Sequence, residues 1–114
     1  MHLPGYLKNS LGAAMLLLSL NAPFASLAEE RVHEVKIFKF KFIPAEITIN
    51  AGDKVRWINK EKRQYHSVWF EALGEPEPDY IFPDESYERV FNDAGDFPYR
   101  CGPHPEMRGM VRVR

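Results

Sequence analysis

From residue 32 onward, apolar and polar positions alternate over short stretches, and no helical period runs through the chain. In Glu46-Ile47-Thr48-Ile49-Asn50, for example, alternate positions are apolar, which indicates a strand with one buried face. Segments rich in β-branched and aromatic residues are separated by Pro, Gly, Asn and Asp. This pattern predicts strands near Val32–Phe38, Glu46–Asn50, Lys54–Asn59, His66–Phe70, Ser86–Phe91, Phe97–Cys101 and Gly109–Arg114.

The connections between these segments are predicted turns and loops. Ala51-Gly52-Asp53 and Asp93-Ala94-Gly95-Asp96 have the composition of tight turns. The segment Glu71–Glu85 is rich in proline and acidic residues, which exclude a central strand and predict a loop. Seven or so short strands at this spacing are typical of an all-β sandwich or small barrel.

The N-terminal segment has a different character. An apolar run, Leu11–Leu20, is followed by the small-residue site Ser26-Leu27-Ala28 and then by Glu29. This layout predicts a secretory signal peptide over residues 1–28 and a mature domain over residues 29–114. An uncleaved membrane anchor is the alternative, but a spanning helix needs about 20 apolar residues. Asn21, Pro23 and the shortness of the apolar run disfavour it.

The net charge of the chain is not informative, but the distribution of charged residues along the sequence is. The chain carries 15 basic and 16 acidic residues, a net charge of −1, which gives no indication of nucleic-acid binding. Basic residues gather between Lys54 and Arg63, and acidic residues between Glu71 and Glu85. These two segments are either solvated loops or surfaces that steer a charged partner.

The candidate chemistry lies near the C terminus, around the single cysteine. Cys101, His104 and Met107 follow one another with the spacing C-x2-H-x2-M. An exported protein with one cysteine can pair it with another chain, bury it as an inert thiol, or use it as a metal ligand. Thiolate and thioether are soft ligands that favour copper, and one further imidazole would complete the His2Cys set with a weak axial Met. The neighbours of Cys101 therefore favour a metal site.

Two ligand positions have competing candidates. For the second imidazole we favour His66 over His33, because nothing local indicates that His33 lies at the same end of the sandwich. For the thioether we favour Met107 over Met110, which the alternation of the last strand assigns to the solvent face. A zinc site is disfavoured because thioether is a poor zinc ligand. A Cys–His nucleophile pair is disfavoured because no third group that would orient its base is recognisable.

These residues resemble the cupredoxins, the small blue copper proteins of the plastocyanin/azurin type, and within them most of all the amicyanins. The resemblance covers nearly all of the predicted mature domain. It is carried by Phe42-x-Pro44, Ile47-x-Ile49, Gly52-Asp53-x-Val55-x-Trp57-Ile58-Asn59, Ala94-Gly95-x-Phe97-x-Tyr99-x-Cys101 and Cys101-x-Pro103-His104-Pro105-x-Met107-Arg108-Gly109.

The resemblance implies a Greek-key β-sandwich that holds one copper ion in a type 1 site, ligated by His66, Cys101, His104 and, weakly, Met107. It implies a periplasmic, monomeric electron carrier rather than an enzyme. Such a carrier docks transiently with redox proteins of the dehydrogenase or cytochrome c class. A copper-binding protein that delivers or buffers copper is the alternative. The family usually has Asn after the first histidine, where this chain has Ser67.

Overall fold

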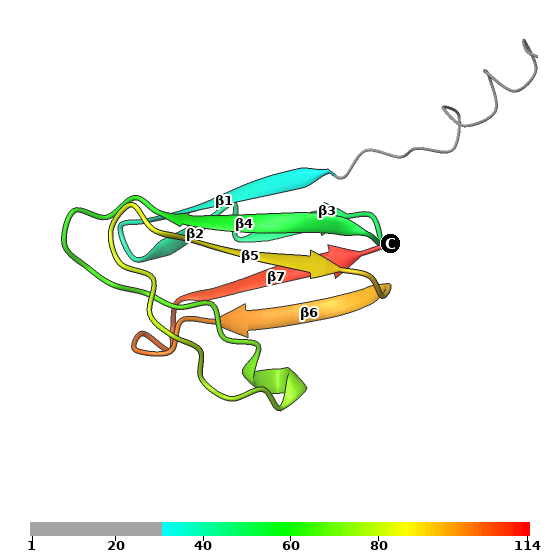
Figure 1. Ribbon diagram of the computed structural model, residues 1–114. Coiled ribbons are helices and arrows are strands. Elements are labelled where there is room, and N and C mark those ends of the chain that lie inside the picture. The colour runs from blue at the N-terminus through cyan, green and yellow to red at the C-terminus, as the bar shows by residue number, and fades with distance from the viewer. Residues whose placement is uncertain (1–30) are drawn as a thin grey trace, which may run out of the picture.

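The computed structural model describes residues 31–114, which form a sandwich of two β-sheets (Figure 1). The predicted signal peptide, residues 1–28, lies outside the described residues. Within residues 31–114 no helix is long and apolar enough to cross a membrane. The elements of this part of the chain are β1 (Val32–Phe38), β2 (Lys41–Ile43), β3 (Glu46–Ile49), β4 (Asp53–Asn59), the 3-10 helix η2 (Glu71–Leu73), β5 (Ser86–Phe91), β6 (Gly95–Arg100) and β7 (Arg108–Val113).

One sheet has the strand order β2-β1-β4-β5 and the other has the order β3-β7-β6. The pairs β1–β4 and β3–β7 are parallel, and the remaining pairs are antiparallel. Consecutive strands lie in different sheets at three points, β2 to β3, β3 to β4 and β5 to β6, so the chain crosses between the layers three times. The predicted all-β sandwich of seven or so strands is confirmed.

The core lies between the sheets and is rich in aromatic side chains. Residues of β4 alternate between buried and half-buried, so that Val55 and Trp57 point inward as the alternation predicted. The Trp57 ring lies at the centre and packs against four other aromatic rings of β5, β6 and the segment after β4. Those four rings belong to Phe70, Tyr87, Phe91 and Tyr99.

The predicted strand His66–Phe70 is wrong as a continuous strand. The structure has only two isolated antiparallel bridges there, His66 with Ile81 and Trp69 with Arg100. The segment divides its backbone hydrogen bonds between two neighbours and therefore joins neither in a regular ladder. The predicted alternation also fails at Ser67, which is buried together with His66 and Val68. The apolar composition of this segment reflects burial on both sides, which alternation alone does not reveal.

The sequence prediction missed the short strand β2. It forms a hairpin with β1 through a turn in which Lys39 and Phe40 adopt φ values of 52° and 59°. This left-handed conformation is uncommon outside glycine, so the sequence carries no local turn signal. By contrast, Glu71–Glu85 is largely irregular, as predicted. It contains only the single turn of η2 and the bridge residue Ile81 before β5 begins.

Candidate metal centre

Two segments that are far apart in the sequence meet at one end of the sandwich, opposite the C terminus (Figure 1). The segment after β4 carries His66, and the loop between β6 and β7 carries Cys101, His104 and Met107. The loop is closed by two backbone hydrogen bonds: Met107 N–H donates to the His104 carbonyl at 2.9 Å, and Cys101 N–H donates to the Met107 carbonyl at 2.9 Å. This closure holds the backbone of Cys101, His104 and Met107 in one compact loop.

The side chains of His66, Cys101 and His104 come together, with their ligand atoms all within 4.8 Å of one another. The Cys101 Sγ atom lies 3.6 Å from His66 Nδ1 and 3.4 Å from His104 Nδ1. His66 and Cys101 are fully buried, whereas His104 is partly exposed. The arrangement thus places two imidazole nitrogens and one sulfur around a common point near the surface.

Hydrogen bonding fixes which nitrogen of His66 is available. Its Nε2 atom lies 2.9 Å from Glu61 Oε2, and a carboxylate can only accept. The proton therefore sits on Nε2, and the Nδ1 lone pair faces Cys101 Sγ. Burial lowers the pKa of His66, which favours the neutral ring that a metal requires.

Glu61 is itself held in place from the β1–β2 turn. Its Oε2 atom also accepts the backbone N–H of Phe40 at 2.9 Å, and its side chain is only 8% exposed. Burial by itself would raise the pKa of Glu61. The hydrogen bonds from the Phe40 amide and from His66 outweigh that effect and hold the pKa below its usual value. Glu61 is therefore a carboxylate that orients His66, the kind of outer partner that metal-binding histidines commonly have.

The Cys101 sulfur is positioned by the segment that carries His66. Ser67 N–H donates to Cys101 Sγ at 3.3 Å, and Gly102 N–H donates to Ser67 Oγ at 2.8 Å. A Cβ atom at Gly102 would displace the Glu77 carboxylate and press against the Ser67 hydroxyl, so glycine leaves room for the hydrogen bond between Gly102 and Ser67. Burial raises the pKa of the Cys101 thiol, and the Ser67 amide opposes that effect. Ser67 therefore ties the two ligand-bearing segments together.

Substitution of Ser67 by Ala should weaken this tie. The variant leaves the partly buried Gly102 N–H without its acceptor, at a cost of about 1 kcal/mol, the lower end of the range for a buried donor. We expect the free energy of unfolding of the metal-free protein, measured in urea, to fall by that amount. Ser86→Ala is the control, because Ser86 is exposed on β5. Equal stabilities of the two variants would contradict the role of Ser67.

Met107 is 4% exposed and lies on the same loop, three residues after His104. Met110 is half-buried within β7, where it pairs with Glu46 on one side and Pro98 on the other. The competing histidine, His33, lies near the start of β1, where its Nε2 is 2.9 Å from Asp53 Oδ2. The C-terminal end of β1 leads to Phe40, which contacts His66 and His104. His33 is near the N-terminal end of β1 and therefore lies away from the site.

Sequence reasoning missed two residues of this site, Glu61 and Phe40. The Phe40 ring meets both imidazoles edge to face, with centroids 5.3 Å from His66 and 4.8 Å from His104. It remains 46% exposed, so it forms an outer cover over the two rings. Neither residue carries a local signal, because Glu61 stands within a run of charged residues and Phe40 within an alternating one.

The residues present fit a copper ion. A thiol sulfur and two imidazole nitrogens face one another, and one imidazole is oriented by a buried carboxylate. Sulfur and imidazole are the donors that copper prefers, and a buried Met on the same loop is available as a weak axial ligand. Hydrogen bonds that exist without the metal hold the His66 ring and the Cys101 sulfur in place.

Glu61→Ala should weaken copper binding. The variant frees the His66 ring to rotate and removes the acceptor of the Phe40 amide, and loss of such an outer partner typically costs about 10–100-fold in metal affinity. Competition against a copper chelator measures the change. Glu34→Ala is the matched control, because Glu34 is exposed on β1. An affinity equal to that of the control would contradict the orienting role.

The comparisons with known proteins point to copper independently. Residues 30–114 match the family described as copper binding proteins of the plastocyanin/azurin family. Amicyanin of Paracoccus versutus is 41% identical over 83 residues, which cover 69% of this chain and 62% of that relative. Amicyanin-alpha of Methylorubrum extorquens is 38% identical over 112 residues, which cover 89% of this chain and 93% of that relative.

Solved structures agree with the sequence relatives. The crystal structure of Paracoccus versutus amicyanin matches with a TM-score of 0.65 and 34% identity over 79% of this chain and 87% of that chain. An oxidised amicyanin variant matches with a TM-score of 0.68 and 35% identity over 79% of this chain and 88% of that chain. The family match, the sequence relatives and the solved structures agree with the fold and with the converging donors. The chain therefore belongs to the plastocyanin/azurin family of copper-binding proteins.

Proposed function

We propose that this protein is a single-electron carrier whose copper is bound by His66, Cys101, His104 and, more weakly, Met107. The observation that carries the proposal is the convergence of both Nδ1 atoms on the Cys101 sulfur, at 3.6 and 3.4 Å. Copper, when bound, supplies the one-electron change between its two oxidation states. The protein then needs to hold one arrangement of ligands for both states.

The hydrogen bonds around the site support such a role. Glu61 fixes the His66 ring, and Ser67 fixes both the Cys101 sulfur and the Gly102 amide. The loop closes on itself through the Cys101 and Met107 amides. These contacts join protein groups only and do not depend on the charge of the metal. They therefore hold the ligands in the same positions in both oxidation states. Little rearrangement means a low barrier to electron transfer.

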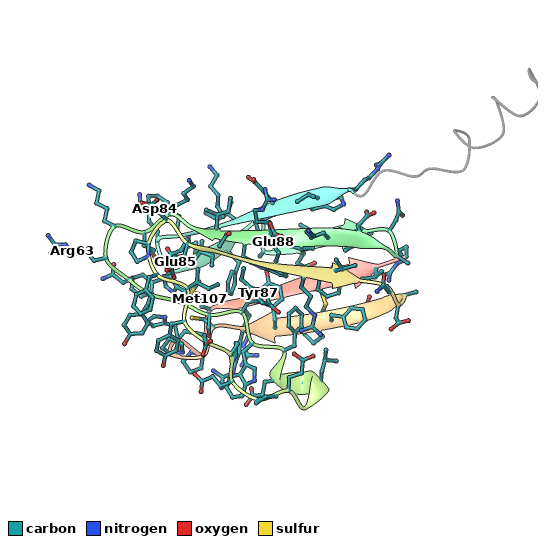
Figure 2. The ribbon with its side chains drawn as sticks, in the orientation of Figure 1. Arg63, Asp84, Glu85, Tyr87, Glu88 and Met107 are labelled. Carbon is teal, nitrogen blue, oxygen red and sulfur yellow. The ribbon has the colours of Figure 1, made fainter. Side chains whose placement is uncertain are left out.

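The exposure of the site is suited to transient docking with a redox protein. His104 is partly exposed, Pro105 is exposed beside it, and the exposed Phe40 ring packs edge to face against the His104 ring. Among the described residues, no ion pair engages Lys62 or Arg63, which follow β4 at the same end. Figure 2 shows Arg63 projecting from that end. A dehydrogenase or a c-type cytochrome is the partner class we expect, and a monomer is the expected state.

The location follows from the N-terminal sequence. We infer that residues 1–28 direct export and that the mature protein works in the periplasm, as the apolar run and small-residue cleavage site favour. Mass spectrometry of the protein purified from a periplasmic extract tests this inference. We expect a mature chain that begins near Glu29. A full-length chain retained in the membrane fraction would contradict it.

A redox titration distinguishes an electron carrier from a copper-delivery protein. The protein is loaded with copper(II) and titrated with ascorbate and then with ferricyanide. We expect an intense blue thiolate-to-copper absorption band and a narrow copper hyperfine splitting in the EPR spectrum. The band should bleach on reduction and return on oxidation, with the metal retained throughout. A pale complex, or one that releases copper on reduction, would overturn the carrier and favour copper delivery.

A further inference from the structure

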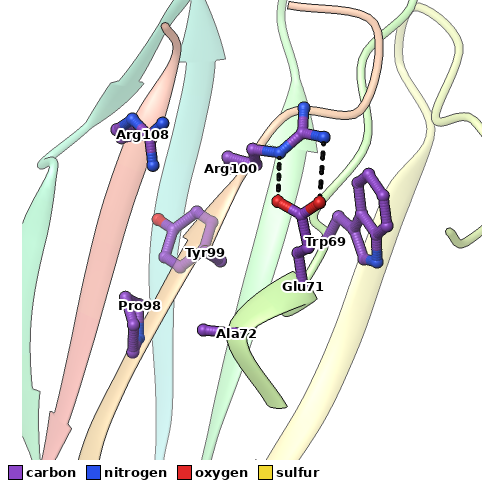
Figure 3. Close-up of a pocket in the computed structure, with 7 residues that line it drawn as sticks. All are labelled: Trp69, Glu71, Ala72, Pro98, Tyr99, Arg100 and Arg108. Carbon is purple, nitrogen blue, oxygen red and sulfur yellow. Dashed lines mark hydrogen bonds and ion pairs between the residues drawn. The ribbon is translucent and has the colours of Figure 1, made fainter. Parts of the chain in front are cut away.

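Arg100, the last residue of β6, makes a dense set of contacts at the start of the metal-site loop. Its Nη1 atom donates to the carbonyls of Cys101 and Gly102 at 3.0 and 3.1 Å. Its Nε and Nη2 atoms donate to the Glu71 carboxylate at 2.7 and 3.4 Å (Figure 3). The guanidinium also lies 4.4 Å from the centre of the Trp69 ring. Only 16% of the Arg100 side chain is exposed, so the group is fixed rather than solvated.

The backbone of Arg100 joins the same segments. Its N–H donates to the Trp69 carbonyl at 3.0 Å, and its carbonyl accepts the Trp69 N–H at 2.8 Å. Trp69 is three residues after His66, and Arg100 directly precedes Cys101. The bridge therefore links the two ligand-bearing segments, and the side chain fastens the start of the loop to η2 through Glu71. No other described side chain donates to the carbonyls of Cys101 and Gly102.

We propose that Arg100 is a positioning residue that holds the Cys101–Gly102 backbone in place and that its charge raises the reduction potential of the bound copper. The inference rests on the proposed function. The planar guanidinium can serve the carboxylate and the carbonyls at once because its donors form a rigid fork. A positive charge near the site favours the copper state with the lower positive charge, which is the reduced one.

Glu71 carries the opposite charge to Arg100. Removing one charge or the other should therefore shift the midpoint potential in opposite directions. The Glu71 side chain is 53% exposed and the Arg100 side chain 16%, so solvent screens the charge of Glu71 more than that of Arg100. Arg100→Gln removes the positive charge and should lower the midpoint potential. Glu71→Gln leaves the guanidinium uncompensated and should raise it. Arg100→Lys keeps the charge but loses the fork, so the potential should stay closer to that of the parent than in Arg100→Gln.

Arg108→Gln is the matched control. Arg108 lies opposite Arg100 in the pairing of β6 with β7 and is exposed. Both arginines line a pocket that also includes Glu71 (Figure 3). It carries the same charge but donates no hydrogen bond to the loop carbonyls within the described part of the chain. A difference between the two glutamine variants therefore reports the contacts of Arg100 rather than the loss of one more cation.

Two measurements decide the proposal. In the metal-free protein, amide hydrogen exchange at Cys101, whose N–H closes the loop onto Met107, should be at least several-fold faster in Arg100→Gln than in Arg108→Gln. Equal exchange in the two variants would overturn the positioning role. In the copper protein, a midpoint potential in Arg100→Gln that is not lower than in Arg108→Gln would overturn the electrostatic role. A parent protein that is not blue would instead overturn the proposed function, while the exchange measurement would still stand.

Discussion

Replacing Cys101 by Ser should abolish the blue absorption of the copper-loaded protein and leave the β-sandwich folded. The absorption requires a thiolate on the metal, and the chain contains no other cysteine. A serine hydroxyl is a hard donor that does not lose its proton readily, so it cannot replace the soft sulfur. The substitution is nearly isosteric, and the hydrogen bond from the Ser67 amide can be retained by the new oxygen. Visible and EPR spectra of the copper(II)-treated variant measure the effect.

A second substitution tests the choice of histidine in the same assay. His33→Gln should leave the blue band unchanged, because His33 pairs with Asp53 away from the site. His66→Gln should remove the band, because it takes away the Nδ1 atom that faces the sulfur at 3.6 Å. Circular dichroism of the metal-free variants checks that each is folded. A blue band that persists in Cys101→Ser, or one lost in His33→Gln, would contradict the assignment of ligands.

Replacing Trp57 by Ala should have the largest effect on stability. Trp57 is fully buried, packs against four aromatic rings and donates its Nε1–H to the Tyr99 hydroxyl at 3.1 Å. Truncating a buried Trp typically costs about 3–5 kcal/mol. Because a small domain has only about 5–15 kcal/mol of stability, this loss should unfold a large part of the metal-free protein at moderate urea concentrations.

Urea unfolding of the metal-free protein measures this effect without the contribution of copper. Trp57→Phe should lose less, because a ring still fills most of the space. Val90→Ala is the surface control, since Val90 is 41% exposed on β5. Binding of copper to the folded state should restore part of the stability of Trp57→Ala by mass action. A cost no greater than that of Val90→Ala would contradict the central position of Trp57 in the core.

The core and the metal centre are connected through Tyr99. Its hydroxyl accepts the Trp57 hydrogen bond, and burial raises the pKa of Tyr99 well above its usual value. Its ring occupies the space above Gly109, where a Cβ atom would overlap it. Gly109 is therefore needed for a close approach between β6 and β7. Cys101 follows Tyr99 by two residues, so packing in the core fixes where the loop begins.

The fold class and a candidate set of donors can be predicted from local patterns in the sequence. Alternation in segments such as Glu46–Asn50 and Lys54–Asn59 predicts strands with one buried face, because side chains on a strand point to opposite sides in turn. The spacing of Cys101, His104 and Met107 predicts a copper loop, because so short a loop forces the three side chains together. These properties are local, and local patterns are what a single sequence displays.

The groups that hold these side chains in place are visible only in the folded molecule. Ser67 meets the Cys101 sulfur across 34 positions of sequence, and Phe40 donates to Glu61 across 21. The segment His66–Phe70 looked like a strand but lies between Ile81 and Arg100 and joins neither in a ladder. Such contacts depend on how the two sheets and their loops pack, because the side chains that meet belong to segments with no shared local pattern. The candidate donors can therefore be predicted from the sequence, whereas the distances between them depend on long-range packing.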